Sequence, residues 1–137
     1  GSGGSTAFSG ERVLGTYDIA RAPYVASAGN LLADLAIPAA MVAAFARQPA
    51  ADLEDRLLSA MKTALSLGGE EGPLHSAGMK IAGAVPWPET DLRVDWADDP
   101  IHELEVLWRL WRPLKNDYVT RALDPASAPA YGVPGDS

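Results

Sequence analysis

The sequence predicts an α+β fold in which helices pack on an antiparallel sheet. Three observations support this prediction: short apolar runs broken by turn residues before residue 30, two stretches of helical periodicity between residues 37 and 66, and alternating apolar and charged residues at 92–96. The 137 residues are enough for one domain with its own core, or for part of a larger domain. The sequence contains no internal repeat.

The first thirty residues predict extended segments separated by turns. Short apolar runs are typical of strands, and they occur at 7–8, 13–14, 17–19 and 24–26. Gly29-Asn30 then indicates a turn, because both residues tolerate positive φ.

Two helices are predicted next. Pro38 suits the first turn of a helix, where its missing N–H needs no partner, and helical spacing continues to Arg47. The second helix has one apolar stripe, and Gly68-Gly69 is predicted to end it with a left-handed cap. Charged residues, among them Glu54, lie off that stripe. The stripe consists of Leu53, Leu57, Leu58, Met61 and Leu65.

Two strands and two further helices are predicted for the second half. Small residues at 76–85 indicate one strand, and the alternation at 92–96 indicates another that is buried on one face. Asp99 and Pro100 predict the start of a third helix, since a carboxylate caps well and proline fits just inside. A short fourth helix is expected over 116–123.

The two ends of the chain differ from this pattern. Residues 124–137 contain three prolines and predict an extended tail that lies over the surface or a partner. Gly-Ser-Gly-Gly at residues 1–4 is typical of engineered linkers, so this stretch is either a cloning scar or native. We therefore expect the folded part to span residues 1–123 with the tail outside it.

Composition excludes several classes of protein. The net charge is −7, and no cluster of cations is available to displace counterions from nucleic acid. No apolar run approaches the roughly 18 residues of a membrane span. The absence of cysteine excludes disulfides, thiolate zinc sites and a cysteine nucleophile within this sequence. No signal peptide is visible, so a cytoplasmic location is expected, without nucleic-acid or membrane partners.

Candidate functional residues lie in two loops. Asn30 places a side-chain amide at a sheet edge, where it can stabilise an oxyanion, although asparagine also occurs in such turns for its left-handed conformation alone. Residues 70–76 carry two carboxylates, including Glu71, with His75 and Ser76, and can orient a polar substrate; a solvated loop is the alternative. No P-loop, dinucleotide motif, nucleophile elbow or metal-binding helix is present, and no cofactor or metal is expected.

The order and spacing of several short motifs resemble a known family. The motifs are STAFSG at 5–10, AGNLL at 28–32, GGEEG at 68–72, VPW at 85–87, DLRVD at 91–95 and DPI at 99–101. On these motifs the chain, from about residue 5 to residue 123, resembles the C-terminal part of the domain-of-unknown-function 1028 (DUF1028) family, proteins similar to N-terminal-nucleophile (Ntn) hydrolases.

The resemblance implies a fold and an activity. The fold is a four-layer αββα sandwich, and the activity is hydrolysis of a small linear amide or peptide-like bond without a cofactor. The nucleophile of such enzymes is an N-terminal Ser, Thr or Cys whose own α-amino group acts as base. Because this chain starts with Gly1, the nucleophile is expected on a partner N-terminal chain, with an oligomer as the active form. Exposure of Ser2, Ser5 or Thr6 by trimming is the alternative.

The resemblance also implies roles for the loop residues. Asn30 becomes the oxyanion donor, and Glu71, His75 and Ser76 become substrate-binding residues. Two other classes remain open: a non-catalytic binding module, for example for cell-wall peptides, and a structural subunit of the same fold.

Eight arginines against three lysines suggest a bacterial source.

Overall fold

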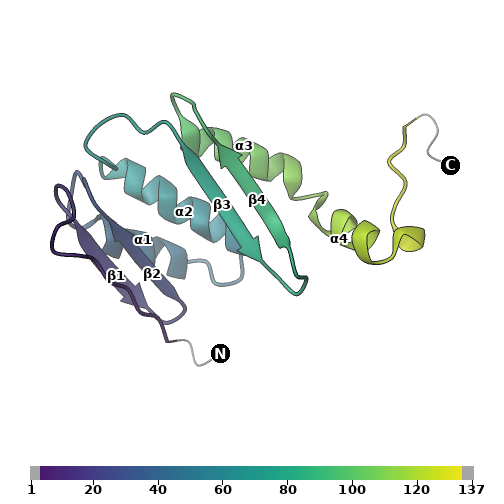
Figure 1. The fold of residues 1–137 in the computed structure, drawn as a ribbon, viewed down its shortest axis with the longest axis horizontal. Helices are drawn as coiled ribbons and strands as arrows, with labels where there is room; N and C mark the ends of the chain where they lie inside the picture. Colours follow the sequence, from purple (N-terminus) through teal and green to yellow (C-terminus); the bar gives the residue numbers. More distant parts are fainter. Residues whose placement is uncertain (1–3, 134–137) are drawn as a thin grey trace.

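The structure, a computed structural model, describes residues 4–133 and consists of two β-hairpins covered on one side by helices (Figure 1). This arrangement confirms the predicted α+β class. The elements in chain order are β1 (Asp18–Ala22), β2 (Val25–Gly29), α1 (Ile37–Ala46), α2 (Leu53–Ser66), β3 (Ala77–Ala82), β4 (Pro88–Val94), α3 (Pro100–Trp111), α4 (Lys115–Leu123) and a 3-10 turn (Pro125–Ser127).

The strands form two separate antiparallel pairs among the described residues. β1 pairs with β2 from Asp18 opposite Gly29 to Ala22 opposite Val25. β3 pairs with β4, and the register shifts at the end of β3. An isolated two-stranded hairpin is at best marginally stable in water, so each pair depends on the helices that cover it.

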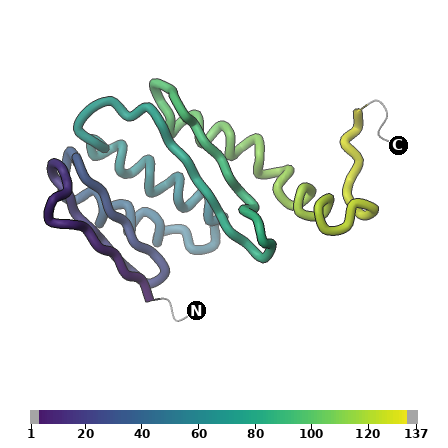
Figure 2. Tube along the Cα trace, in the orientation of Figure 1, coloured from purple at the N-terminus to yellow at the C-terminus, as the bar shows by residue number. Residues whose placement is uncertain are grey.

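The helices bury one face of each hairpin. α1 covers β1 and β2, where the Ser27 hydroxyl contacts the Met41 sulfur at 3.3 Å. α2 and α3 cover β3 and β4, and the trace shows α2 running behind the space between the two hairpins (Figure 2). The main core joins α2, β3 and α3 and consists of Leu58, Met79, Ile81, Leu104 and Trp108.

Most predicted elements are found within a few residues of their expected bounds. The predicted left-handed end of the second helix is confirmed, because Gly68 and Gly69 have φ values of 102° and 63°. Residues 7–8 and 13–14, predicted as strands or extended segments, belong to no strand. The backbone pairing of Leu14 consists of one hydrogen bond, from the Leu31 N–H to the Leu14 carbonyl at 3.2 Å, which is too little to make a strand.

The predicted tail begins with a 3-10 turn and then extends from the body (Figure 1). The Arg121 guanidinium donates to the Pro129 carbonyl at 2.6 Å and lies 3.8 Å from the Tyr131 ring centre. Residues 134–137 of the predicted tail, and residues 1–3 of the predicted linker, lie outside the described residues. Within residues 4–133, no helix is long and apolar enough to cross a membrane.

Replacing Asp99 with alanine is expected to lower the unfolding free energy by about 1 kcal/mol. The Asp99 carboxylate accepts a hydrogen bond from the His102 N–H at 3.2 Å and thereby caps α3. Urea unfolding of both proteins measures the difference. Asp99→Asn should retain most of the stability because the amide oxygen can still accept, whereas equal losses in both variants would contradict the capping role.

Candidate functional site

The loop after β2 is fixed from two sides by backbone hydrogen bonds. On one side the Leu32 N–H donates to the Thr16 carbonyl at 2.9 Å. On the other, the Ala33 N–H donates to the Gly69 carbonyl at 2.9 Å and the Glu71 N–H donates to the Leu31 carbonyl at 2.6 Å. We call this meeting of residues 14–16, 30–33 and 69–71 the junction. It holds the predicted turn and the predicted polar loop together.

Asn30 lies half-buried in the junction. Its Nδ2 donates to the Leu14 carbonyl at 3.4 Å. The suggestion that asparagine is needed there for a left-handed backbone is wrong, because the positive φ (51°) falls on Leu31. A side-chain amide has two N–H donors. Among the described residues the Leu14 contact engages one of them, so the amide retains the capacity to donate to a ligand.

The other three predicted residues divide between two places. Glu71 is anchored in the junction through its backbone, and its side chain is exposed. His75 and Ser76 lie at the far end of the same loop, just before β3. The His75 ring stacks on Trp96 with ring centres 4.1 Å apart, and its Nδ1 lies 3.1 Å from the Ala97 carbonyl.

The contact with the Ala97 carbonyl indicates which ring nitrogen of His75 carries the proton. Because a carbonyl only accepts, Nδ1 carries the proton in this contact, which leaves Nε2 as an acceptor in the neutral ring. Ser76 is exposed. The structure therefore brings Asn30 and Glu71 together in the junction. His75 instead packs against Trp96 and Ala97, in the segment after β4, and has no contact with Asn30 among the described residues.

An apolar groove runs from the junction along β2. It consists of two hollows of about 220 and 240 Å³ that share Ala28 and Met41. We call it the β2 groove. The hollow at the junction end is lined by Gly29, Leu32, Met61, Leu65 and Glu70. The other is lined by Val25, Ser27, Phe45, Leu57 and Ala60. Each hollow is smaller than the roughly 300–1,000 Å³ of ordinary ligand pockets.

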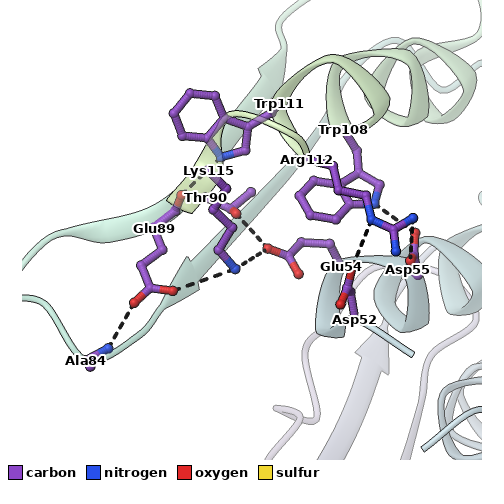
Figure 3. Close-up of polar contacts among 10 residues, drawn as sticks. All are labelled: Asp52, Glu54, Asp55, Ala84, Glu89, Thr90, Trp108, Trp111, Arg112 and Lys115. Carbon is purple, nitrogen blue, oxygen red and sulfur yellow. Dashed lines mark hydrogen bonds and ion pairs between the residues drawn. The ribbon is translucent and has the colours of Figure 1, made fainter. Parts of the chain in front are cut away.

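A buried polar network lies away from the junction, between α2, β4 and α4 (Figure 3). Glu54 is 2% exposed and Thr90 is 0% exposed. The Thr90 hydroxyl donates to Glu54 Oε1 at 2.6 Å, and the Lys115 ammonium donates to the same oxygen at 3.0 Å. Lys115 also lies 3.6 Å from Glu89. The sequence pattern places Glu54 off the apolar stripe of the second helix, so it did not predict this network.

Burial alone would raise the pKa of Glu54. Hydrogen bonds from Thr90, from the Glu54 backbone and from Lys115, together with the Lys115 charge, outweigh burial and lower that pKa. The carboxylate is therefore charged and fully partnered at neutral pH. Its neighbours are partnered as well: the Trp108 indole N–H donates to Asp55 at 2.8 Å, and Arg112 pairs with Asp52 at 2.9 Å.

This network has a structural role. In the described part of the chain, no buried side-chain nitrogen or oxygen lacks a hydrogen-bond partner, so the buried groups of the network stabilise one another. The signal that could have predicted it is charge complementarity: three acidic residues begin the second helix, and three basic residues follow one another along the third and fourth. They are Asp52, Glu54 and Asp55, and Arg109, Arg112 and Lys115.

Comparison with known proteins assigns the family. The sequence model described as "Family of unknown function (DUF1028)" matches residues 1–104. The chain belongs to the DUF1028 family. This DUF1028 chain is also similar to the crystal structure of protein SPO2555 from Silicibacter pomeroyi, with a TM-score of 0.71 and 29% sequence identity. The match covers 88% of this chain and 52% of that protein, so the chain spans about half of the length of its relative. No curated protein matches the chain.

Acid is expected to destabilise this DUF1028 chain through Glu54. The pKa of Glu54 is lowered in the folded state, so the unfolded state binds more protons and stability rises with pH. The charged Glu54 carboxylate stabilises the fold fully at pH values above 4.5, the ordinary pKa of glutamate. This stabilisation is lost as the pH falls from 4.5 through the lowered pKa of the folded state. Urea midpoints measured from neutral pH into this acid range should fall for the natural chain and change less for Glu54→Gln.

Glu105 provides the internal check on that measurement. The contacts with Lys62 and Arg109 lower its pKa as well, and this carboxylate is present in both proteins. A residual acid loss is therefore expected in Glu54→Gln. Identical pH profiles for the two proteins would contradict the contribution of Glu54.

Proposed function

We propose that this DUF1028 chain is the C-terminal part of an Ntn-type amidohydrolase with an αββα sandwich. The enzyme would cleave a small linear amide or a peptide-like bond. Its Ser, Thr or Cys nucleophile would come from a partner N-terminal chain, and the complex would act in a bacterial cytoplasm. The observation that carries the proposal is the junction, which holds the loop bearing Asn30 between Gly29 and Leu32, two residues that line an apolar groove.

In this proposal the chain provides the oxyanion donor. The nucleophile on the partner attacks the amide carbonyl, and its α-amino group takes the proton. Negative charge develops on the carbonyl oxygen, to which the Asn30 Nδ2 donates. The C–N bond then breaks, the amine leaves with a proton, and water hydrolyses the acyl-enzyme. Because backbone hydrogen bonds hold the loop on both sides, the donor is oriented before the substrate binds.

The remaining loop residues would bind the substrate. The exposed Glu71 carboxylate can accept hydrogen bonds from amide or ammonium groups beside the scissile bond. His75 Nε2 can accept one further along the substrate, since the Trp96 stack and the Ala97 contact fix its ring. Ser76 supplies an exposed hydroxyl next to it. This set favours a polar, hydrogen-bonding substrate.

Native mass spectrometry of the protein purified from its source tests the proposal, together with N-terminal sequencing and assays on linear amides. The expected result is a second polypeptide in fixed ratio that begins with Ser, Thr or Cys, and a complex that releases amine from an amide. A complex without such a residue, or one that hydrolyses no amide, would overturn the proposed activity.

A further inference from the structure

We propose that the β2 groove receives an extended segment of the companion half of the protein, which adds to the open edge of β2. The inference rests on the proposed function in one respect, since the companion is the partner chain invoked there. It adds where that partner binds and by which kind of contact. The surface is the β2 groove, with the facing edge of β3 beyond it.

The first argument is the open edge of β2. Within residues 4–133, β2 pairs with β1 alone, and no backbone hydrogen bond joins it to any other segment. Opposed residues of an antiparallel pair alternate in whether they exchange hydrogen bonds. Every second residue of β2 therefore directs its N–H and C=O away from β1, toward the groove. Such an edge is a template for another strand.

The second argument is that the two hairpins lie on the same helical layer. β2 and β3 face one another across the space in front of α2 (Figure 1). The helix surface there is apolar, and Leu65 is 46% exposed although it lines the groove. A segment placed between the strands would cover this surface and pair with β2. It would also turn two marginal hairpins into parts of a wider sheet.

The third argument concerns the occupant. The two hollows share Ala28 and Met41, and between them they are lined by every residue of β2. A surface that follows a whole strand suits an extended chain better than a compact ligand. The similar protein from Silicibacter pomeroyi has about as much chain again as the part matched here, so the family supplies a segment to fill the groove.

The position of the groove links this surface to Asn30. At one end the groove closes on the junction, where Leu32 bridges to Glu70. A companion segment along β2 must therefore end or turn beside residues 30–33. Binding in the groove would bring residues of the companion next to the Asn30 amide.

Hydrogen exchange of the chain, free and bound to its companion, tests this inference. Amides of β2 are expected to exchange at least about tenfold more slowly in the complex, whereas amides of α4 should not change. A complex in which β2 exchanges as fast as in the free chain would overturn the inference. So would a homodimer that protects β2, or a chain that binds no companion.

Two matched variants test the groove itself. Leu65→Lys places a charge in the groove and should weaken binding of the companion at least about tenfold. Leu110→Lys makes the same change on α3, where Leu110 is 65% exposed and lines none of the groove. Both side chains are exposed, so both variants should fold. Equal affinities would overturn the inference.

Failure of the proposed function gives a different result. A companion that protects β2 and is weakened by Leu65→Lys, but carries no N-terminal nucleophile, would support the groove and reject the hydrolase. An active complex with unprotected β2 would support the hydrolase and reject the groove.

Discussion

Replacing Asn30 with alanine is expected to lower kcat of the proposed amidohydrolase complex by about 10²- to 10³-fold, with little change in KM. The Asn30 amide would donate to an oxygen whose negative charge develops only during the reaction. Its loss therefore raises the energy of the transition state more than that of the bound substrate. Steady-state kinetics of the complex on a linear amide measure the effect.

The control must separate chemistry from folding, because Asn30 also donates to the Leu14 carbonyl. Asn116→Ala removes the other asparagine of the chain, on the exposed surface of α4, and should leave kcat unchanged. The 3.4 Å bond to Leu14 is long, so Asn30→Ala should keep a thermal midpoint close to that of the natural complex. Unchanged kcat, or a loss of kcat that follows a loss of folded protein, would remove Asn30 from the mechanism.

Local sequence signals were sufficient for the helices. Pro38 and Asp99-Pro100 mark helix starts through their own backbone chemistry, and Gly68-Gly69 marks an end because glycine adopts positive φ without strain. These signals act within one turn of helix. They do not depend on what the helix packs against, which explains why the predicted bounds agree closely with the structure.

Long-range contacts could not be predicted in the same way. The runs at 7–8 and 13–14 have strand composition, but the described segment before β1 contacts it through a side chain, the Ser5 hydroxyl that donates to the Ala22 carbonyl at 2.9 Å, and not through a backbone ladder. His75 was identified as a polar loop residue, yet its stack on Trp96 brings together residues that only the folded β3–β4 hairpin makes neighbours. The junction likewise depends on the return of α2 to the loop after β2. Its members were predicted one at a time, and their meeting was not.

Glu54 shows most clearly why a stripe of apolar residues does not include every residue on the buried face of a helix. The apolar stripe of the second helix was correct for Leu58, which is in the core. Glu54 lies one turn earlier and is also buried, because Lys115 and Thr90 approach from α4 and β4. A carboxylate is buried when partners compensate for its lost hydration, and no local pattern shows that those partners will arrive.

Replacing Glu54 with alanine is therefore expected to lower the unfolding free energy of the chain by about 3 kcal/mol. The loss has two parts. Thr90 keeps a buried hydroxyl without its acceptor, and Lys115 keeps a charge that, among residues 4–133, Glu89 alone still compensates, at 3.6 Å. Urea unfolding followed by tryptophan fluorescence measures the loss. Glu11→Ala, the same change at an exposed residue of the N-terminal segment, should alter stability by less than about 0.5 kcal/mol.

A double-mutant cycle with Lys115→Met separates the two parts. In the Lys115→Met background, Glu54→Ala leaves no uncompensated ammonium. The unfolding free energy lost through Glu54→Ala should therefore be smaller in that background than in the natural chain, by at least about 1 kcal/mol. The remaining loss reports the unsatisfied Thr90 hydroxyl, and Thr90→Val should remove most of it. Additive losses for Glu54 and Lys115 would show that the two charges do not interact. The contribution of Glu54 would then come from its hydrogen bonds with Thr90 and with the backbone.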